Sequence, residues 1–368
     1  MELFNVNDFE LAAKLKLEKS IYEYIAGGAG DEYTLKRNSE ALEHLQLVPR
    51  ILRSSDTVQT NIKLLDHQLT YPLFVAPMAF HRSVHDLGEL ATVSAVNKAG
   101  IGMVLSTMST IALEDVAQTA LNPLWFQLYI YKDRQITQQL IKRAELAGFK
   151  ALVLTVDVPI MGTREKDRRN HFKLQPGLVA KNFEETEEIN SDIKHYTDAQ
   201  FDPNLTWRDI EWIQSHTHLP VILKGVMHEE DAAIALDLNV AAIIISNHGG
   251  RQLDYMPATI EVLPIIAAVV NKKIPLLIDG GFKRGINIFK AIALGADCVM
   301  LGRSVLWALA VNGEEGVSRL LDIYFKELKE IMILCGCSTI EEIKIQGKSI
   351  LRFNNSRGHR SYGTNRLS

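Results

Sequence analysis

Short apolar runs recur along the chain from residue 71 onward, and each is followed by a stretch in which polar and apolar residues alternate with helical spacing. Runs that are apolar at nearly every position are typical of parallel strands buried on both faces. Segments 133–147 and 257–270, which lie between such runs, have the spacing of amphipathic helices. The eight runs begin at Tyr71, Gly102, Leu124, Ala151, Pro220, Ala241, Pro275 and Cys298. Eight strand–helix units are the number that closes a barrel, so the pattern predicts an α/β fold of the (β/α)8 or TIM-barrel type.

A doubly wound open sheet is the competing architecture for alternating strands and helices. Such sheets usually have fewer strands, and the dinucleotide-binding ones carry a glycine-rich turn after the first strand. Here the first run is followed by Met78-Ala79-Phe80-His81, without a G-x-G-x-x-G motif in that region. The barrel is therefore favoured.

The pattern divides a single domain of residues 1–368 into four parts. Residues 1–70 form an N-terminal helical cap that we expect to close one end of the barrel, and residues 71–351 form the barrel itself. Residues 158–205 are a long loop after the fourth strand, and a connection of that length in a compact domain is usually functional or disordered. We expect the acidic run 184–188 of this loop to be mobile. The polar, basic tail 352–368 is expected to be solvated or to bridge subunits.

Composition excludes several classes of protein. With 40 basic and 44 acidic side chains the net charge is −4, which argues against nucleic acid or an anionic membrane as the main partner. Three cysteines cannot build a disulfide framework, which fits a reducing compartment. The first residues lack the layout of a signal peptide, and no apolar stretch approaches the ~18 residues of a membrane helix. We expect a soluble, cytoplasmic protein. His81 and His85 lack a third metal ligand, so we expect them in a polar surface or loop role and expect no metal site.

Polar and ionisable residues lie where six of the predicted strands end. The carboxyl ends of barrel strands meet at one face, where barrel enzymes carry their active sites. Several of these residues, such as Lys224 and His248, are not turn formers, so a turn alone does not explain them. The strand-end residues are Gln127 and Tyr129, Thr155 and Asp157, Lys224, the segment 246–254, Asp279 to Gly281, and Gly302 with Arg303. They predict an active site at this mouth of the barrel.

The last two of these strand ends have the composition of a phosphate site. Gly280 and Gly281 precede Lys283, and Gly302 precedes Arg303, so bare backbone N–H groups lie beside cations. Barrels commonly bind phosphate at this position. Each glycine pair alone is more often a turn, but two pairs on adjacent strands favour a phosphorylated cofactor or substrate.

The sixth strand end carries a proton acceptor close to a guanidinium. His248 is followed by two glycines and Arg251. A base beside a carboxylate-binding arginine suits the removal of hydrogen from the carbon next to a carboxylate. Asp157 could hold the imidazole and stabilise its charged form.

The motif SNHGGRQLD at 246–254 resembles the active-site signature of the FMN-dependent α-hydroxy-acid oxidising enzymes, the family of glycolate oxidase and L-lactate oxidase. The resemblance extends over essentially the whole chain. The supporting motifs, in chain order, are YIAGGAGDE, APMA, FQLY, TVD, LKGV, DGGFKRG and LGR.

The resemblance implies a role for each candidate residue. His248 would be the base or proton acceptor, paired with Asp157. Lys224 would lie at the N1/O2 edge of the flavin, where positive charge favours the anionic reduced form. The substrate would be bound by Tyr24, Tyr129, Arg164 and Arg251. The FMN would be held by Pro77, Met78, Ala79, Ser106, Gln127, Thr155 and Ser246, with its ribityl chain on Asp279 and its phosphate on Gly280, Gly281, Lys283, Gly302 and Arg303.

The same resemblance implies the reaction. A small (S)-2-hydroxy acid would be oxidised to the 2-oxo acid, and O₂ would reoxidise the flavin to give hydrogen peroxide. It also implies a homotetramer or homo-octamer. We expect L-lactate to be favoured over glycolate, because Met78 and Met108 stand where plant glycolate oxidases carry Thr and Trp. Met161 and Phe201 are expected to approach the pocket as well. Two further departures are Lys283 in place of the usual arginine, which loses the bidentate fork, and Thr163 in place of the first of two arginines.

Other functions remain open. A dehydrogenase of the same family would pass electrons to a quinone or cytochrome, and a lactate monooxygenase would let O₂ react before the product leaves. A more distant alternative is an FMN- or nucleotide-binding barrel isomerase, or an enzyme similar to IMP dehydrogenase. The latter needs a catalytic cysteine on a middle loop, whereas the first cysteine, Cys298, lies in the eighth predicted strand. Cys335 and Cys337 are expected to be buried free thiols, and Lys166, Arg168 and Arg169 to be solvated charges.

Overall fold

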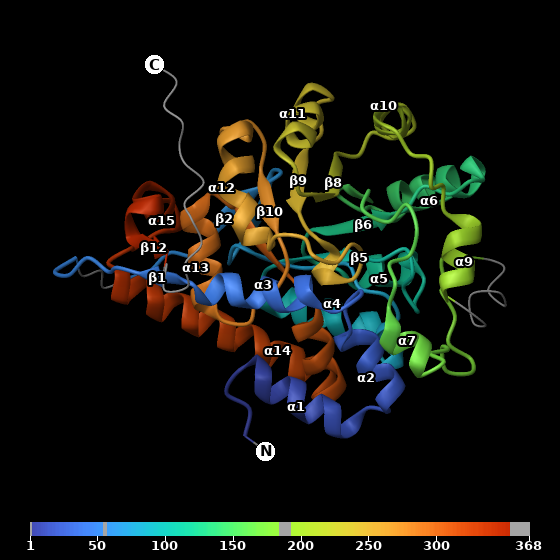
Figure 1. Cartoon of the computed structure of the whole chain (residues 1–368), viewed down its shortest axis with the longest axis horizontal. Helices are drawn as coiled ribbons and strands as arrows, with labels where there is room; N and C mark the ends of the chain where they lie inside the picture. Colours follow the sequence, from blue (N-terminus) through green and yellow to red (C-terminus); the bar gives the residue numbers. More distant parts are fainter. Residues whose placement is uncertain (1, 54–56, 184–192, 354–368) are drawn as a thin grey trace.

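The computed structural model describes residues 2–53, 57–183 and 193–353, and its centre is a closed barrel of eight parallel strands (Figure 1). The strands follow one another around the barrel in chain order, with β11 closing onto β4. They are β4 (Leu73–Val75), β5 (Gly102–Leu105), β6 (Leu124–Leu128), β7 (Leu152–Thr155), β8 (Val221–Val226), β9 (Ala242–Ile245), β10 (Leu276–Ile278) and β11 (Cys298–Leu301). Each strand lies inside one of the eight apolar runs, so the predicted (β/α)8 barrel is confirmed.

Helices follow the strands and surround the barrel (Figure 1). The two helices expected at 133–147 and 257–270 are present with starts shifted by one or two residues. The helix after β11 is long and contains a break at Asn312 and Gly313, where the backbone leaves helical geometry. The surrounding helices are α4 (Gly88–Ala99), α5 (Leu113–Thr119), α6 (Arg134–Ala147), α10 (Trp207–Ser215), α11 (Glu229–Asp237), α12 (Thr259–Val270), α13 (Gly285–Leu294) and α14 (Arg303–Cys335).

The interior of the barrel is filled by apolar side chains that alternate along the strands. Phe74, Val104 and Trp125 belong to this cluster, and each is fully buried. Leu64 and Leu69 join it from a hairpin formed by β2 (Ile62–Leu64) and β3 (His67–Leu69). The hairpin therefore closes one end of the barrel, as the sequence predicts for the N-terminal segment. The opposite end is left for the site.

The N-terminal segment also supplies three helices: α1 (Val6–Lys16), α2 (Lys19–Ala26) and α3 (Tyr33–Glu43). A capping box of Asn5 and Asp8 starts α1, which packs against α14. Helix α3 lies against the short helix η2 (His248–Gly250), at the end of β9. Strand β1 (Leu45–Leu47) pairs with β12 (Leu351–Phe353), and the remaining elements are η1 (His81–Ser83), α15 (Ile340–Gln346) and η3 (Gly347–Ile350).

In the described residues of the long loop after β7 lie the helices α7 (Glu165–Arg169) and α9 (Ile193–Gln200). The Asp198 carboxylate of α9 accepts a hydrogen bond from the Met161 N–H at 3.2 Å, which ties the two ends of the loop together. The acidic run 184–188 and the tail from residue 354 lie outside the described residues, so the expectations for both stay predictions.

Two expectations about individual side chains are wrong. His81 is buried, and its Nδ1 lies 3.0 Å from Thr92 Oγ1, so it belongs to the packing under η1 and not to a surface loop. Lys166 is half-buried and forms a salt bridge with Glu32 at 2.8 Å, so it is not a solvated charge. The prediction that Cys335 and Cys337 are buried free thiols is confirmed.

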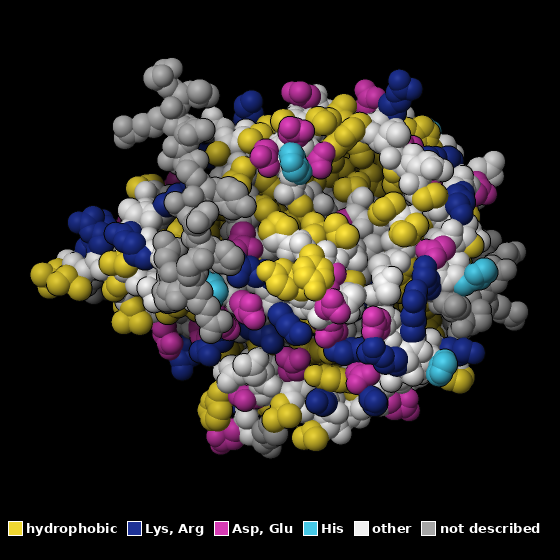
Figure 2. Space-filling model, viewed as in Figure 1, with side chains coloured by type: hydrophobic (Ala, Val, Ile, Leu, Met, Phe, Trp, Pro, Cys, Tyr) yellow, Lys and Arg dark blue, Asp and Glu magenta, His cyan; other side chains and the backbone are white. Residues whose placement is uncertain are grey.

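Charged side chains of both signs are interspersed over the lower half of the face in Figure 2, with no separation by sign. Within the described ranges no helix combines the length and the apolar composition that crossing a membrane requires.

The hairpin that closes the barrel makes a testable prediction. Leu64 is 2% exposed, and Leu64→Ala should destabilise the protein by about 2–5 kcal/mol because it leaves a cavity under the barrel. Thermal and urea unfolding should show a clearly lowered midpoint, while Leu15→Ala, at a position 76% exposed, should stay within about 0.5 kcal/mol. Equal midpoints for the two variants would contradict the assignment of the hairpin as the barrel's closure.

Candidate active site

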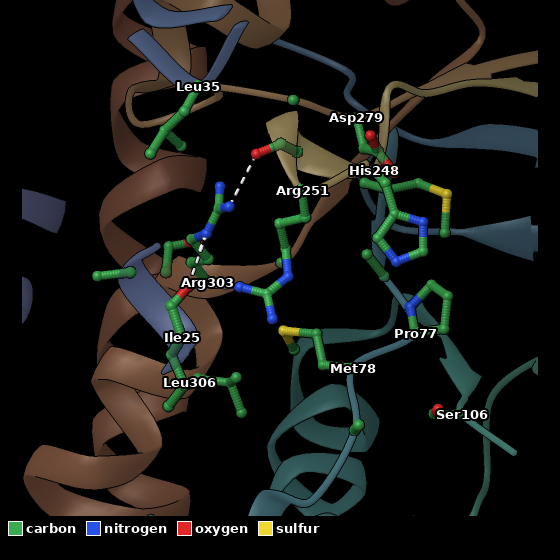
Figure 3. A pocket seen from close by; sticks show the side chains of 18 of the residues that line it. Ile25, Leu35, Pro77, Met78, Ser106, His248, Arg251, Asp279, Arg303 and Leu306 are labelled. Atoms are coloured by element: carbon green, nitrogen blue, oxygen red, sulfur yellow. Dashed lines mark hydrogen bonds between the residues drawn. The ribbon is translucent and has the colours of Figure 1, made fainter. Parts of the chain in front are cut away.

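A cavity of about 560 Å³ lies at the carboxyl ends of the barrel strands (Figure 3). Its walls come from the strand ends, from α1 to α3, and from the long loop after β7. All the site residues expected from the sequence line this cavity except Asp157 and Ser246, and these two make hydrogen bonds to lining side chains. The lining residues among them are Tyr24, Pro77, Met78, Ala79, Ser106, Gln127, Tyr129, Thr155, Arg164, Lys224, His248, Arg251, Asp279, Gly280, Gly281, Lys283, Gly302 and Arg303.

His248 reaches the cavity through an unusual turn after β9. His248, Gly249 and Gly250 have φ angles of 55°, 63° and 75°, so three successive residues occupy the left-handed region. A β-carbon on Gly249 would lie 3.0 Å from Arg303 Nη1, so the turn needs glycine for space as well as for conformation. The His248 N–H is held by Ser246 Oγ at 3.1 Å. In Figure 3 the imidazole and the guanidinium of Arg251 point into the same space.

Asp157 orients the His248 ring. Nδ1 of His248 lies 3.0 Å from Asp157 Oδ1 and 3.3 Å from Oδ2. Burial would raise the pKa of Asp157, but His248 and then Lys224 favour its charged form, and the net pKa lies below the usual value. Burial is the largest cause that lowers the pKa of His248, Lys224 and Arg164 lower it further, and together they outweigh the rise that Asp157 causes. At neutral pH the pair is therefore a carboxylate and a neutral imidazole, with the hydrogen on Nδ1 and a free lone pair on Nε2.

Close approach of Asp157 to the neighbouring strand depends on Gly225, a residue that the sequence analysis did not single out. A β-carbon there would lie 2.7 Å from the Asp157 β-carbon, and the φ of Gly225 is 115°. The register between β8 and β9 shifts at this point, between Lys224 and Val226. A glycine inside a strand pattern is the available signal for such an irregularity.

Two arginines of the cavity donate hydrogen bonds to backbone carbonyls at the C-terminal end of α2. Arg251 Nη1 donates to Tyr24 O at 2.6 Å and to Gly27 O at 3.1 Å. Arg303 donates from Nε to Ile25 O at 2.9 Å and from Nη2 to Gly249 O at 2.8 Å, as drawn in Figure 3. The C-terminal end of a helix carries partial negative charge, so it stabilises both cations. In the described part of the chain neither arginine forms a direct salt bridge.

A third arginine, Arg164, completes a surplus of positive charge. Burial lowers the pKa of Arg164 to about 10, with repulsion from Arg251 adding to the effect. Burial and the same neighbour lower the pKa of Arg303 to about 9. Guanidiniums that are buried without a carboxylate partner provide strong hydrogen-bond donors for an anion.

Aromatic stacking holds both tyrosines of the site. The Tyr24 ring is stacked on Phe172 at 4.1 Å between centroids, and the Arg251 guanidinium lies 5.0 Å from its centroid. Tyr129 stacks on Phe201 at 4.4 Å, and burial raises its pKa, so its hydroxyl remains a proton donor. Phe201 lines the cavity, as predicted, whereas Phe172 was missed because no spacing connects it with the strand ends.

Unsatisfied polar atoms in the cavity fit a flavin. Gln127 Oε1 accepts from Ser106 Oγ at 3.3 Å and from Thr107 N at 3.2 Å, yet Gln127 Nε2 is buried without a partner in the described structure. Asp279 Oδ1 is buried and unpartnered as well, while Asp279 Oδ2 lies 3.4 Å from Lys224 Nζ. A buried donor and a buried acceptor cost free energy unless a ligand meets them. A ring with imide and carbonyl groups and a hydroxylated chain can meet both.

The glycine-rich end of the cavity is packed against α3. A β-carbon on Gly281 would lie 2.5 Å from Asn38 O, so glycine is required where the backbone approaches this helix. Lys283 lies beside it, but its Nζ pairs with Glu10 Oε2 at 3.2 Å. Glu10 itself lines the cavity. The sequence analysis missed this acidic partner, because α1 is distant in sequence from the barrel strands.

The fold is a closed parallel barrel, and its mouth gathers a histidine paired with an aspartate, three arginines and a glycine-rich end. Residues 13–350 match the model of the family described as FMN-dependent dehydrogenase. The chain belongs to this family, with FMN as its cofactor, and is an FMN-dependent 2-hydroxy-acid oxidase.

Individual relatives support this assignment. The chain is 46% identical over 350 residues to an L-lactate oxidase of Nostoc sp., covering 92% of this chain and 96% of the relative. It is 43% identical over 349 residues to a glycolate oxidase of Spinacia oleracea, covering 93% and 95%. A crystal structure of mandelate oxidase superposes with a TM-score of 0.89 at 39% identity, covering 95% and 98% of the two chains.

The geometry of His248 makes a direct prediction. His248→Gln keeps a polar side chain of similar size but removes the proton acceptor, so anaerobic flavin reduction by a 2-hydroxy acid should fall at least about 10³-fold. The variant should still be folded and yellow. His216→Gln, at an exposed position outside the cavity, is the matched control and should reduce its flavin at the wild-type rate. Reduction of the His248 variant at a rate near wild type would show that the base is another group.

Proposed function

We propose that this oxidase converts L-lactate to pyruvate with O₂ as the electron acceptor, forming hydrogen peroxide, and that glycolate is a slower substrate. The observation that carries the proposal is the composition of the cavity wall. Met78, Met108 and Met161 line the same cavity as His248 and Arg251. Methionine offers flexible apolar surface that adapts to a small alkyl group.

In this account the substrate carboxylate is bound by Arg164 and Arg251. Tyr129 donates a hydrogen bond to the substrate, and its raised pKa keeps that proton in place. His248 Nε2 accepts the proton of the substrate's hydroxyl group. Asp157 stabilises the resulting imidazolium through the 3.0 Å contact between its Oδ1 and His248 Nδ1. FMN, when bound, would supply a two-electron acceptor for the hydride of the substrate's C2, and this hydride together with the proton taken up by His248 would balance the reduction of O₂ to hydrogen peroxide.

Lys224 supports the cofactor side of the site. Its Nζ is buried, donates to Ser246 Oγ at 2.8 Å and lies 3.4 Å from Asp279. We propose that this ammonium lies against the N1/O2 edge of the flavin and stabilises negative charge there. At the other end of the cavity, the backbone of Gly280, Gly281 and Gly302 would hold the phosphate with Lys283 and Arg303.

Preference for lactate rests on one methyl group. Burying a methylene-sized apolar group stabilises a complex by about 0.8 kcal/mol, and such a group changes discrimination by about 1–3 kcal/mol. A small difference in free energy between the two substrates is consistent with the relatives. The chain is 46% identical to the L-lactate oxidase of Nostoc sp. and 43% identical to the glycolate oxidase of Spinacia oleracea. The homotetramer or homo-octamer implied by the family resemblance and the reducing, cytoplasmic location stay predictions.

Mixing the yellow protein anaerobically with L-lactate or glycolate tests the proposal. L-lactate should bleach the flavin band faster, and readmitted air should give one peroxide per pyruvate. Faster bleaching by glycolate would overturn the substrate preference. Bleaching without peroxide would instead indicate the dehydrogenase or the monooxygenase.

Met108 gives the preference a structural test. Met108→Trp should fill the space of the substrate's methyl group and lower kcat/KM for L-lactate about tenfold more than for glycolate. Met108→Leu, which nearly conserves volume, should leave the ratio of the two kcat/KM values unchanged. An unchanged ratio in the tryptophan variant would show that Met108 does not contact the C2 substituent.

A further inference from the structure

A carboxylate without a hydrogen-bond partner lies behind the arginines of the site. Asp167 belongs to α7, one turn after Arg164, which is the N-cap residue of that helix. Asp167 Oδ2 is buried and has no donor in the described structure. Asp167 is not among the residues that line the cavity, so it does not face the substrate directly.

The charged groups that act on Asp167 are the two arginines assigned to the substrate carboxylate. Arg251 and Arg164 both favour its ionised form, although burial raises its pKa overall. In return, Asp167 favours the charged form of Arg164. None of these groups is joined to Asp167 by a direct salt bridge in the described ranges, so the interaction is Coulombic and acts at a distance.

Packing holds the backbone of Asp167 beside the site. The Asp167 carbonyl accepts a hydrogen bond from Phe172 N at 2.9 Å. Phe172 stacks on Tyr24, and the Arg251 guanidinium lies 5.0 Å from the centroid of the Tyr24 ring. Helix α7 also packs against α2, which carries Tyr24. The backbone of Asp167 is therefore joined to the stack of Phe172 and Tyr24, over which Arg251 lies.

A fixed anion behind two cations reduces the attraction that they exert on a second anion. The substrate and the 2-oxo acid product carry the same carboxylate, so a site that binds the first tightly also retains the second. We propose that Asp167 is a positioning residue that balances the charge of Arg164 and Arg251 and thereby keeps the product weakly bound. The inference rests on the proposed binding of the carboxylate by these two arginines.

Charge-removing variants of the FMN-loaded enzyme test the inference. Asp167→Asn and the smaller Asp167→Ser should each lower the dissociation constant of oxalate and of pyruvate about five- to tenfold, measured by titrating the oxidised flavin absorbance. In turnover, KM should fall and kcat should fall with it, because product release slows. Loss of packing alone would weaken binding, so tighter binding is a result that a purely structural role does not produce.

Two controls separate charge from position. Asp167→Glu keeps the charge and should bind oxalate within about twofold of wild type. Glu165→Gln removes a charge from the same helix, at a residue that pairs with Arg169 on the surface, and should leave the dissociation constant unchanged.

The outcomes are distinct. If wild-type enzyme does not bind oxalate, the proposed carboxylate site itself is wrong. If wild type binds oxalate but both neutral variants bind it equally or more weakly, the role of Asp167 is overturned while the carboxylate site stands. If both neutral variants lose FMN or fail to fold while the glutamate variant is stable, the inference is also overturned, because the charge is then needed for structure.

Discussion

Burial of positive charge beside the C-terminal end of α2 is the constraint on which the site depends. Arg251 and Arg303 come from different strand ends, yet both donate to Gly27 O, at 3.1 and 3.3 Å. Without these carbonyls, two guanidiniums would lie close together in a cavity with no salt-bridge partner in the described structure. The helix end therefore makes it feasible to hold two cations side by side in the cavity.

The same arrangement explains the form of the turn after β9. Gly249 must leave room for the Arg303 guanidinium, while its carbonyl accepts a hydrogen bond from Arg303 Nη2 at 2.8 Å. In the same turn the backbone of His248 is in the left-handed region, with φ of 55°, and its imidazole lines the cavity. Lys224 also matters for the chemistry, because it favours the ionised form of Asp157 and, together with burial and Arg164, opposes protonation of His248. A neutral base can thus exist next to an anion-binding site.

Much of this architecture follows from local sequence. The eight apolar runs specify the barrel, since the strands of a closed parallel sheet are buried on both faces. Strand-end residues such as Lys224 and His248 could be assigned to one mouth because barrel topology brings carboxyl ends together. The partners of those residues were harder to predict. Glu10, Phe172 and the carbonyl of Gly27 come from the N-terminal helices and the long loop, whose contacts depend on tertiary packing and have no periodic signal. The burial of His81 could not be predicted from the sequence for the same reason.

The central claim is that His248 acts as a neutral base, and the pH dependence of anaerobic flavin reduction tests it most directly. The second-order rate constant for reduction by L-lactate reports the free enzyme, so it follows the protonation of His248. Burial lowers the pKa of His248 below its ordinary value of 6.5. The rate constant should therefore be level from neutral to mildly alkaline pH, and it should fall on acidification with a midpoint below pH 6.5. A rate constant that rises on acidification, or one whose fall has its midpoint above pH 6.5, would contradict the account, because a protonated imidazole cannot accept the proton and burial lowers the pKa of His248.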